Sequence, residues 1–182
     1  MTQVLDARAT NCTVSSINVT TDIMESTDIK ALYNDDSLVI MQTAEDAFQR
    51  GSNRIEEIKN FALKAGIKRI GIAHCVTFPN EVKAVTQFLS DEFQVFSVDC
   101  KCGKVTKHEM LGCEGKSIMC NPAGQAKYLE DNKTELNISM GLCVGHDMVF
   151  NQKSDSPVTT LVVKDRPSNH NPVASINQLI VI

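Results

Sequence analysis

Hydrophobic and polar residues follow two patterns along this chain. In the first, apolar residues recur every three or four positions, which is the spacing of one face of an α-helix. In the second, short runs rich in Val and Ile are apolar throughout, as expected for strands covered on both faces in a parallel sheet. The first pattern predicts a short helix near 28–33 and further helices over 37–50, 53–65, from 79, from 121, over about 146–153 and from 171. The second predicts strands over 68–75, 93–99, 136–142 and 158–164.

The order of these segments predicts the fold class. Strands and helices alternate from residue 68 on, which is typical of an α/β domain with right-handed crossovers. We therefore expect a single three-layer α/β domain with a mainly parallel sheet of about four to five strands and a helical N-terminal region. Residues 1–36 are rich in Thr, Ser, Asn and Asp without a sustained period, so we assign 1–36 to a loosely structured N-terminal arm and 37–182 to the α/β domain.

Composition and charge narrow the class of function. The chain has 182 residues and a formal net charge of −4, and it lacks a Lys/Arg run that could follow a phosphate backbone, so nucleic acid is not an expected partner. No apolar stretch approaches the roughly 20 residues that span a bilayer, and the N-terminus lacks a signal-like segment, so we expect a cytoplasmic protein without membrane contact. Self-association into a homo-oligomer stays open.

The chain contains seven cysteines, and most of them follow predicted strands. In a reducing compartment, a cysteine-rich chain more often binds a metal or carries catalytic thiols than forms disulfides. An odd number of cysteines also argues against a fully paired disulfide framework. The carboxyl ends of parallel strands meet at one edge of a sheet, where ligands bind. The sequence therefore predicts a metal site at this edge that holds zinc or an iron–sulfur cluster. Its expected ligand core is Cys100, Cys102, Cys120 and Cys143, with Cys75 and His146 as additional candidates.

Local patterns support this choice of ligands. Side chains two apart in an extended segment point the same way, so Cys100 and Cys102 are expected to face one centre. Cys120 lies just before a predicted helix N-terminus, where the dipole lowers a thiol pKa. Cys12 and Cys113 are expected to be buried small residues or surface thiols outside the site.

Positive charge near the site suggests a ligand. Lys164 and Arg166 follow the last predicted strand, and they are expected to stabilise thiolates and to bind a small anion. Two alternatives to a plain metal-binding protein stay open. One is a metal- or cluster-dependent enzyme that acts on a small anionic or sulfur-containing substrate held by Lys164 and Arg166. The other is a metal-free redox switch in which Cys100 or Cys120 is a low-pKa cysteine.

Several short motifs in this order resemble an uncharacterised prokaryotic family that is described only as metal-binding or zinc-binding proteins of unknown function. The motifs are Cys-Lys-Cys-Gly at 100–103, Met-Cys-Asn-Pro at 119–122 with Gly-Gln-Ala at 124–126, Gly-Leu-Cys-Val-Gly-His-Asp at 141–147, Pro-Val-Thr at 157–159, Lys-Asp-Arg at 164–166 and His-Asn-Pro at 170–172. The similarity runs from about Asn53 to Ile176. It implies a cysteine-centred site made of Cys75, Cys100, Cys102, Cys120, Cys143, His146 and Asp147, and a polar C-terminal signature made of Lys164, Asp165, Arg166, His170 and Asn171.

The chain departs from that family in two places. Family members often carry a further cysteine-rich segment near the N-terminus, where this chain has only Cys12. Cys113 does not match the pattern either. The resemblance therefore implies the cysteine-centred site named above, and it carries no ligand set over to the N-terminal arm.

Overall fold

The computed structural model describes residues 29–180, and most of the predicted N-terminal arm lies outside them. Contacts between Cα atoms divide the chain into two units, residues 1–40 and 41–182. In the first unit a short 3-10 helix, η2 (Ile29–Leu32), precedes α1 (Asp35–Ala47), and α1 runs across the division. None of the helices described within 29–180 is long and apolar enough to cross a membrane.

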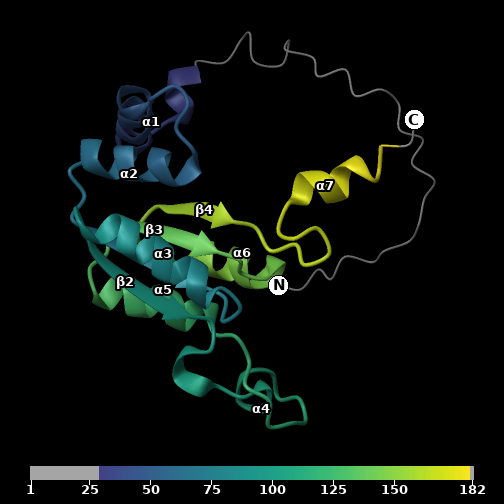
Figure 1. The fold of residues 1–182 in the computed structure, drawn as a ribbon. Helices are drawn as coiled ribbons and strands as arrows, with labels where there is room; N and C mark the ends of the chain where they lie inside the picture. The colour runs from purple at the N-terminus through teal and green to yellow at the C-terminus, as the bar shows by residue number, and fades with distance from the viewer. Residues whose placement is uncertain (1–28, 181–182) are drawn as a thin grey trace. The chain divides into compact units, whose positions relative to one another are not determined.

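The second unit is an α/β domain built on a four-stranded parallel sheet (Figure 1). The strands are β1 (Arg69–His74), β2 (Gln94–Asp99), β3 (Leu136–Met140) and β4 (Val158–Val162), in the order β2-β1-β3-β4. Every neighbouring pair is parallel. The predicted fold class and its sheet are confirmed, each strand being a residue or two shorter than its apolar run. The chain moves outward in opposite directions from β1 and from β3, so the strand order reverses between these two strands.

Helices join the strands and cover both faces of the sheet. The helix α2 (Arg54–Lys64) leads into β1, and α3 (Pro79–Ser90) connects β1 to β2. The helices α5 (Pro122–Asp131) and α6 (Val144–Lys153) connect β2 to β3 and β3 to β4. Figure 1 shows α3 over one face and α5 and α6 over the other, which gives the predicted three layers. The last described helix is α7 (Pro172–Asn177).

The core forms where the central strands meet these helices. All five residues of β3 are buried, because β3 lies inside the sheet with a helical layer on either side. Gly71 in β1 allows one helix to lie very close: a Cβ at this position would meet the Asn137 side chain at 2.2 Å and Leu129 of α5 at 2.8 Å. The edge strand β4 is only partly buried along its whole length.

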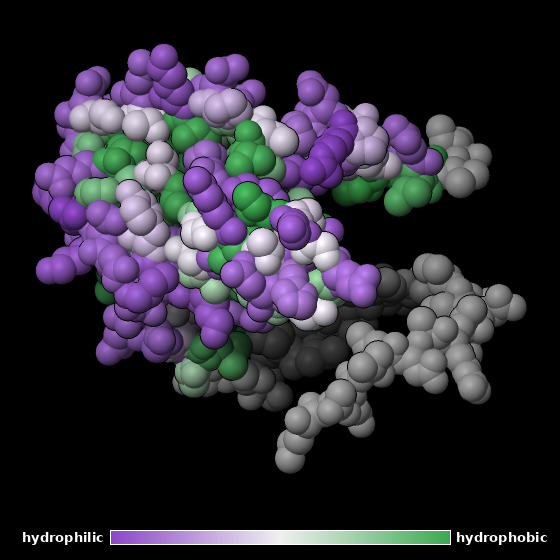
Figure 2. Space-filling model, turned by 90° about the horizontal axis from the view of Figure 1, so that it is seen from below, coloured by the Kyte–Doolittle hydropathy of each residue, from purple (hydrophilic) through white to green (hydrophobic). Residues whose placement is uncertain are grey.

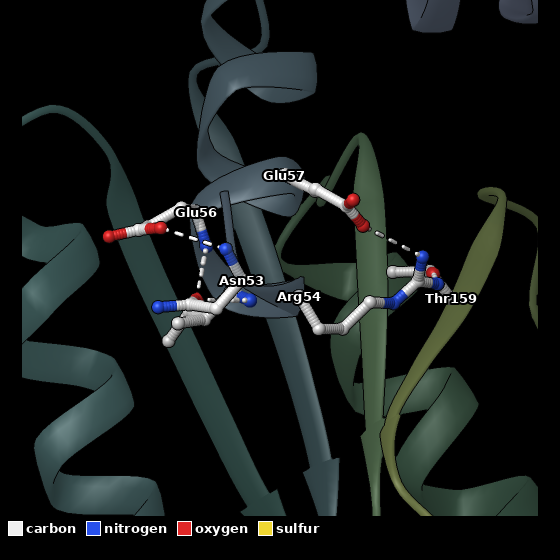
Figure 3. A network of polar contacts seen from close by, with 6 residues as sticks. Asn53, Arg54, Glu56, Glu57 and Thr159 are labelled. Carbon is white, nitrogen blue, oxygen red and sulfur yellow. Dashed lines mark hydrogen bonds and ion pairs between the residues drawn. The ribbon is translucent and has the colours of Figure 1, made fainter. Parts of the chain in front are cut away.

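The first turn of α2 combines a helix cap with a link to the sheet (Figure 3). Asn53 accepts from the amides of Ile55 and Glu56, and the Glu56 carboxylate accepts from the Asn53 amide, forming the capping box expected from this spacing. Arg54 donates to the Thr159 hydroxyl in β4 at 2.5 Å and pairs with Glu57 at 3.7 Å. This contact ties the start of α2 to the edge strand.

Residues 101–119 form an excursion between β2 and α5. They contain a 3-10 turn, η3 (Cys102–Lys104), and the short helix α4 (Lys107–Leu111). An antiparallel bridge between Thr106 and Ile118 pairs the two arms of the excursion. Figure 2 views the molecule from the side on which α4 lies, and most of that face is hydrophilic. This segment, for which the apolar pattern predicts neither a helix nor a strand, is an ordered hairpin that carries a short helix.

Candidate functional site

The candidate site lies at the carboxyl ends of the four strands. Cys75 directly follows β1, Cys100 directly follows β2, Cys143 lies three residues after β3, and Lys164 lies two residues after β4. Because all four strands are parallel, these residues share one edge of the sheet. The reversal of strand order between β1 and β3 falls at the same edge, which is where ligands bind in open α/β sheets.

Cys100 and Cys120 form a pair of thiols. The Cys120 Sγ lies 3.5 Å from the Cys100 Sγ, and the Asn121 amide donates to the Cys100 carbonyl at 2.8 Å. Burial raises the pKa of Cys100 to about 12; the neighbouring Cys120 adds to this, and a hydrogen bond from the Val76 backbone opposes it. Of the two cysteines named by the redox-switch alternative, Cys100 therefore has a raised and not a lowered pKa, because a thiolate there is desolvated and faces a second sulfur.

Cys75 and Cys143 are joined through Lys164. The Lys164 ammonium donates to the Cys75 Sγ at 2.6 Å and to the Cys143 Sγ at 3.8 Å, and the Thr77 hydroxyl donates to the Cys75 Sγ at 3.3 Å. Burial raises the pKa of Cys75, but the bonds from Lys164 and Thr77 outweigh it and lower the pKa from 9.0 to about 7. The charge of Cys75 also raises the pKa of Cys100, so the two thiol groups belong to one electrostatic site.

The Cys102 thiol contacts a backbone carbonyl. Its Sγ lies 3.6 Å from the Asn121 carbonyl, and burial, followed by the charge of Asp99, raises its pKa. The strand β2 ends at Asp99 and the chain turns at Cys100 and Lys101, so the alternation of side chains in an extended segment does not reach Cys102. The structure brings Cys100 beside Cys120 instead.

The helix α6 begins directly after Cys143, and His146 and Asp147 lie in its first turn. His146 is half-buried, and its pKa is lowered by burial and then by the charges of Lys101 and Lys164, which leaves the imidazole neutral and able to ligate. Asp147 has a buried Oδ1 that lacks a hydrogen-bond partner within residues 29–180. His146 therefore lies within electrostatic reach of Lys164, which contacts the Cys75 and Cys143 sulfurs.

The loop after Lys164 is held by hydrogen bonds and a ring contact. The Asp165 amide donates to the His170 Nδ1 at 3.1 Å, and the Ser175 hydroxyl donates to the Asp165 carboxylate at 2.6 Å. The His170 ring packs edge-on against Phe78, with ring centroids 4.7 Å apart. Arg166, the other predicted anion ligand, is exposed. Of the two predicted cations, only Lys164 contacts the thiols in the part of the chain that the structure describes.

Gly141 allows the loops after β1 and β3 to meet. It adopts a left-handed φ of +65°, and a Cβ there would lie 2.0 Å from the Phe78 ring. Phe78 is buried, with 5% of its surface exposed. Both the backbone conformation and the close approach require glycine. Phe78 therefore packs between the loop that carries Cys143 and the loop that carries Lys164.

Gln125 of α5 is a positioning residue that periodicity alone did not identify. It is fully buried, and its side-chain amide donates to the carbonyls of His74 at 3.2 Å and Val98 at 2.9 Å. These carbonyls stand just before Cys75 and Cys100, so Gln125 fixes the spacing between the ends of β1 and β2. A signal was present in the sequence, because Gln125 shares the buried stripe of α5 with Pro122 and Leu129.

The donor chemistry of this edge fits a thiophilic metal. Thiolates are the ligands that zinc and iron–sulfur clusters prefer, and the sulfurs of two cysteines here, Cys100 and Cys120, lie 3.5 Å apart. Within residues 29–180, no group of three or more His, Cys, Asp or Glu side chains is arranged closely enough to hold a metal ion as it stands. Cys113 is exposed on the excursion, and Cys12 lies outside the described residues.

Comparisons with known proteins give a family without an assigned activity. The family described as "Protein of unknown function (DUF1847)" matches residues 14–161. An uncharacterized protein of Methanocaldococcus jannaschii is 43% identical over 136 residues, which cover 72% of this chain and 70% of the relative. No solved structure matches the chain. The range matched by the family, residues 14–161, spans the positions of Cys75, Cys100, Cys120 and Cys143, whereas Lys164 lies beyond it.

Proposed function

The chain belongs to the DUF1847 family of unknown function, and we propose that it is a metal-binding protein whose thiolates hold a thiophilic metal at the carboxyl edge of the sheet. The proposed ligands are Cys75, Cys100, Cys120 and Cys143. His146 is the alternative fourth ligand, and Cys102 is left out because its Sγ faces the Asn121 carbonyl. The observation that carries the proposal is the 3.5 Å separation between the Cys100 and Cys120 sulfurs.

This separation supports a single metal ion. With zinc–sulfur bonds of about 2.3 Å, two thiolates of a tetrahedral site lie about 3.8 Å apart. The Cys100 and Cys120 sulfurs are already close to that spacing. A [4Fe–4S] cluster takes one thiolate for each iron, which separates its cysteines further. Zinc therefore ranks first, and a [2Fe–2S] cluster, with two thiolates on each iron, ranks second.

Charge balance gives Lys164 a role in such a site. Four thiolates around a divalent ion leave an excess negative charge, and this excess is costly in a half-buried location. Lys164 brings a cation to within 2.6 Å of the Cys75 Sγ and 3.8 Å of the Cys143 Sγ. The metal would supply a fixed centre that cross-links the loops after three strands, and Lys164 would offset the charge of the thiolates.

The proposal is tested by measuring metal and acid-labile sulfide in protein purified without oxygen. We expect one equivalent of zinc, or iron with equimolar sulfide, in the native chain. Cys100→Ser and Cys120→Ser should lose the metal, because each removes one thiolate of the preformed pair. Cys113→Ser is the matched control, since it removes an exposed thiol nearby and should keep the metal. Native protein without metal, or full metal in both pair variants, would refute the proposal.

A second candidate function rests on Cys75. Its sulfur is bonded to Lys164 and Thr77, and its pKa is lowered to about 7, which favours a thiolate nucleophile near neutral pH. In this alternative, Cys75 acts on a small electrophilic or sulfur-containing substrate without a metal, and Lys164 is also a binding group for an anionic substrate. Metal-free native protein in which Cys75 alone reacts rapidly with a small disulfide would favour this function over the first.

A further inference from the structure

The Cys100 and Cys120 pair lies at the base of the excursion formed by residues 101–119, and the backbone there is already closed. The Asn121 amide donates to the Cys100 carbonyl at 2.8 Å. Further out, the Met119 amide donates to the Val105 carbonyl at 2.8 Å, and Thr106 and Ile118 form an antiparallel bridge. The two arms that carry these thiols are therefore paired without help from the sulfurs.

We propose that Cys100 and Cys120 are a peroxide-sensitive thiol pair that forms a reversible disulfide across the base of this excursion. A disulfide needs its sulfurs about 2.05 Å apart, so this pair has to approach by only about 1.5 Å. Side-chain rotation supplies that movement, because the neighbouring backbones are already hydrogen-bonded to each other. By contrast, the Cys102 Sγ, at the start of η3, faces the Asn121 carbonyl instead of a second sulfur.

Exposure sets the order of the chemical steps. Cys100 has 2% of its surface exposed, whereas Cys120 is only partly buried, so peroxide reaches the Cys120 sulfur first. Cys120 attacks one peroxide oxygen, the O–O bond breaks, and the products are a sulfenic acid and one water. The Cys100 sulfur then attacks the sulfenic sulfur, the S–S bond forms, and the hydroxyl leaves as a second water with the remaining thiol proton. The two thiols lose two electrons, and the peroxide gains them.

The disulfide regulates the site if the proposed function holds. This step rests on the metal-binding function, because a disulfide sulfur is no longer a thiolate ligand. Oxidation would remove two ligands at once and release the metal, and reduction would restore them. Metal bound to both thiolates would in turn protect them from peroxide. The pair would therefore couple metal content to the oxidant level.

Trypsin identifies the pair without ambiguity, because Cys100 lies in the peptide 84–101 and Cys120 in 117–127, while Cys102 lies in 102–104. The native chain is first freed of metal with a chelator, then treated with hydrogen peroxide, alkylated, digested and analysed by mass spectrometry. We expect 84–101 linked to 117–127 as the main oxidised product, lost on reduction. The Cys102→Ser variant should give the same linked peptide.

The outcomes separate the two proposals. Absence of this linked peptide, or a dominant link from 84–101 to the Cys75 peptide, overturns the thiol pair whatever the metal content. Its formation in a chain that never held metal supports the pair and counts against the metal site. In metal-loaded protein, we expect metal release to rise in step with the linked peptide. A disulfide that forms with the metal retained supports the pair and removes Cys100 and Cys120 from the ligand set.

Discussion

Replacing Lys164 by methionine removes the ammonium that lies 2.6 Å from the Cys75 Sγ while keeping a long side chain. Lys164 is the largest influence that lowers the pKa of Cys75 from 9.0 to about 7, and burial opposes it. Without the ammonium, burial acts against the Thr77 bonds alone, and we expect the pKa to rise toward its ordinary value of 9.0. The difference corresponds to about 2.7 kcal/mol at about 1.4 kcal/mol for each pH unit.

Two measurements on metal-free, reduced protein test this prediction. At about pH 8, a thiol with a pKa of about 7 is roughly nine-tenths ionised, and one with a pKa of about 9 is roughly one-tenth ionised. The ultraviolet absorbance of the thiolate, measured against pH in the native chain and in Cys75→Ser, gives the titration of Cys75 by difference. The same difference is then measured on a Lys164→Met background.

The stability of the fold should follow the same titration. The folded-state pKa is lowered, so the stabilisation is fully present above the unfolded pKa of about 8.5 to 9 and is lost as the pH falls through about 7. The free energy of unfolding in urea should therefore rise from about pH 6 to about pH 9 by up to ~2.7 kcal/mol more in the native chain than in Lys164→Met. A Cys75 thiolate that still titrates near 7 in the variant would refute the reasoning.

Three further changes test how the edge of the sheet is held. Gly141→Ala should cost about 2–5 kcal/mol of unfolding free energy in urea, because its Cβ would lie 2.0 Å from Phe78; a variant as stable as the native chain would contradict this packing. Gln125→Leu should cost about 1–3 kcal/mol, because the carbonyls at the ends of β1 and β2 lose their donor, and hydrogen exchange should rise at those ends but not in β4. His170→Ala should raise the pKa of Cys75 part of the way to 9.0, since it loosens the loop that follows Lys164. An unchanged titration of the Cys75 thiolate would show that this loop does not influence the site.

The elements and the edge that carries the thiols follow from the sequence, because unbroken apolar runs and glycine or proline boundaries decide them. The runs over 68–75 and 136–142 became β1 and β3, which are covered on both faces. Parallel pairing then brings Cys75, Cys100 and Cys143 to one edge whatever their side chains do. The shared location of these three cysteines could therefore be predicted from the strand topology alone.

The direction of the side chains at the strand ends could not be predicted from the sequence, because the turns after the strands determine it. The regular alternation that predicted Cys102 beside Cys100 stops at Asp99, and the turn brings Cys120 there instead. The partner of Lys164 depends on a contact that spans 89 residues, and no local pattern encodes it. One helix that was not predicted did have a local signal, since Thr106 and Glu109 form a capping box at the start of α4.

The order of the strands along the chain has a consequence for synthesis. Every proposed thiol ligand precedes residue 144, whereas Lys164 comes after β4, the last strand within residues 29–180. Within the described sheet β4 pairs with β3, and the Lys164 ammonium reaches Cys75 from the segment that follows β4. A nascent chain that ends before β4 therefore carries the proposed sulfur ligands without the ammonium that would offset their charge.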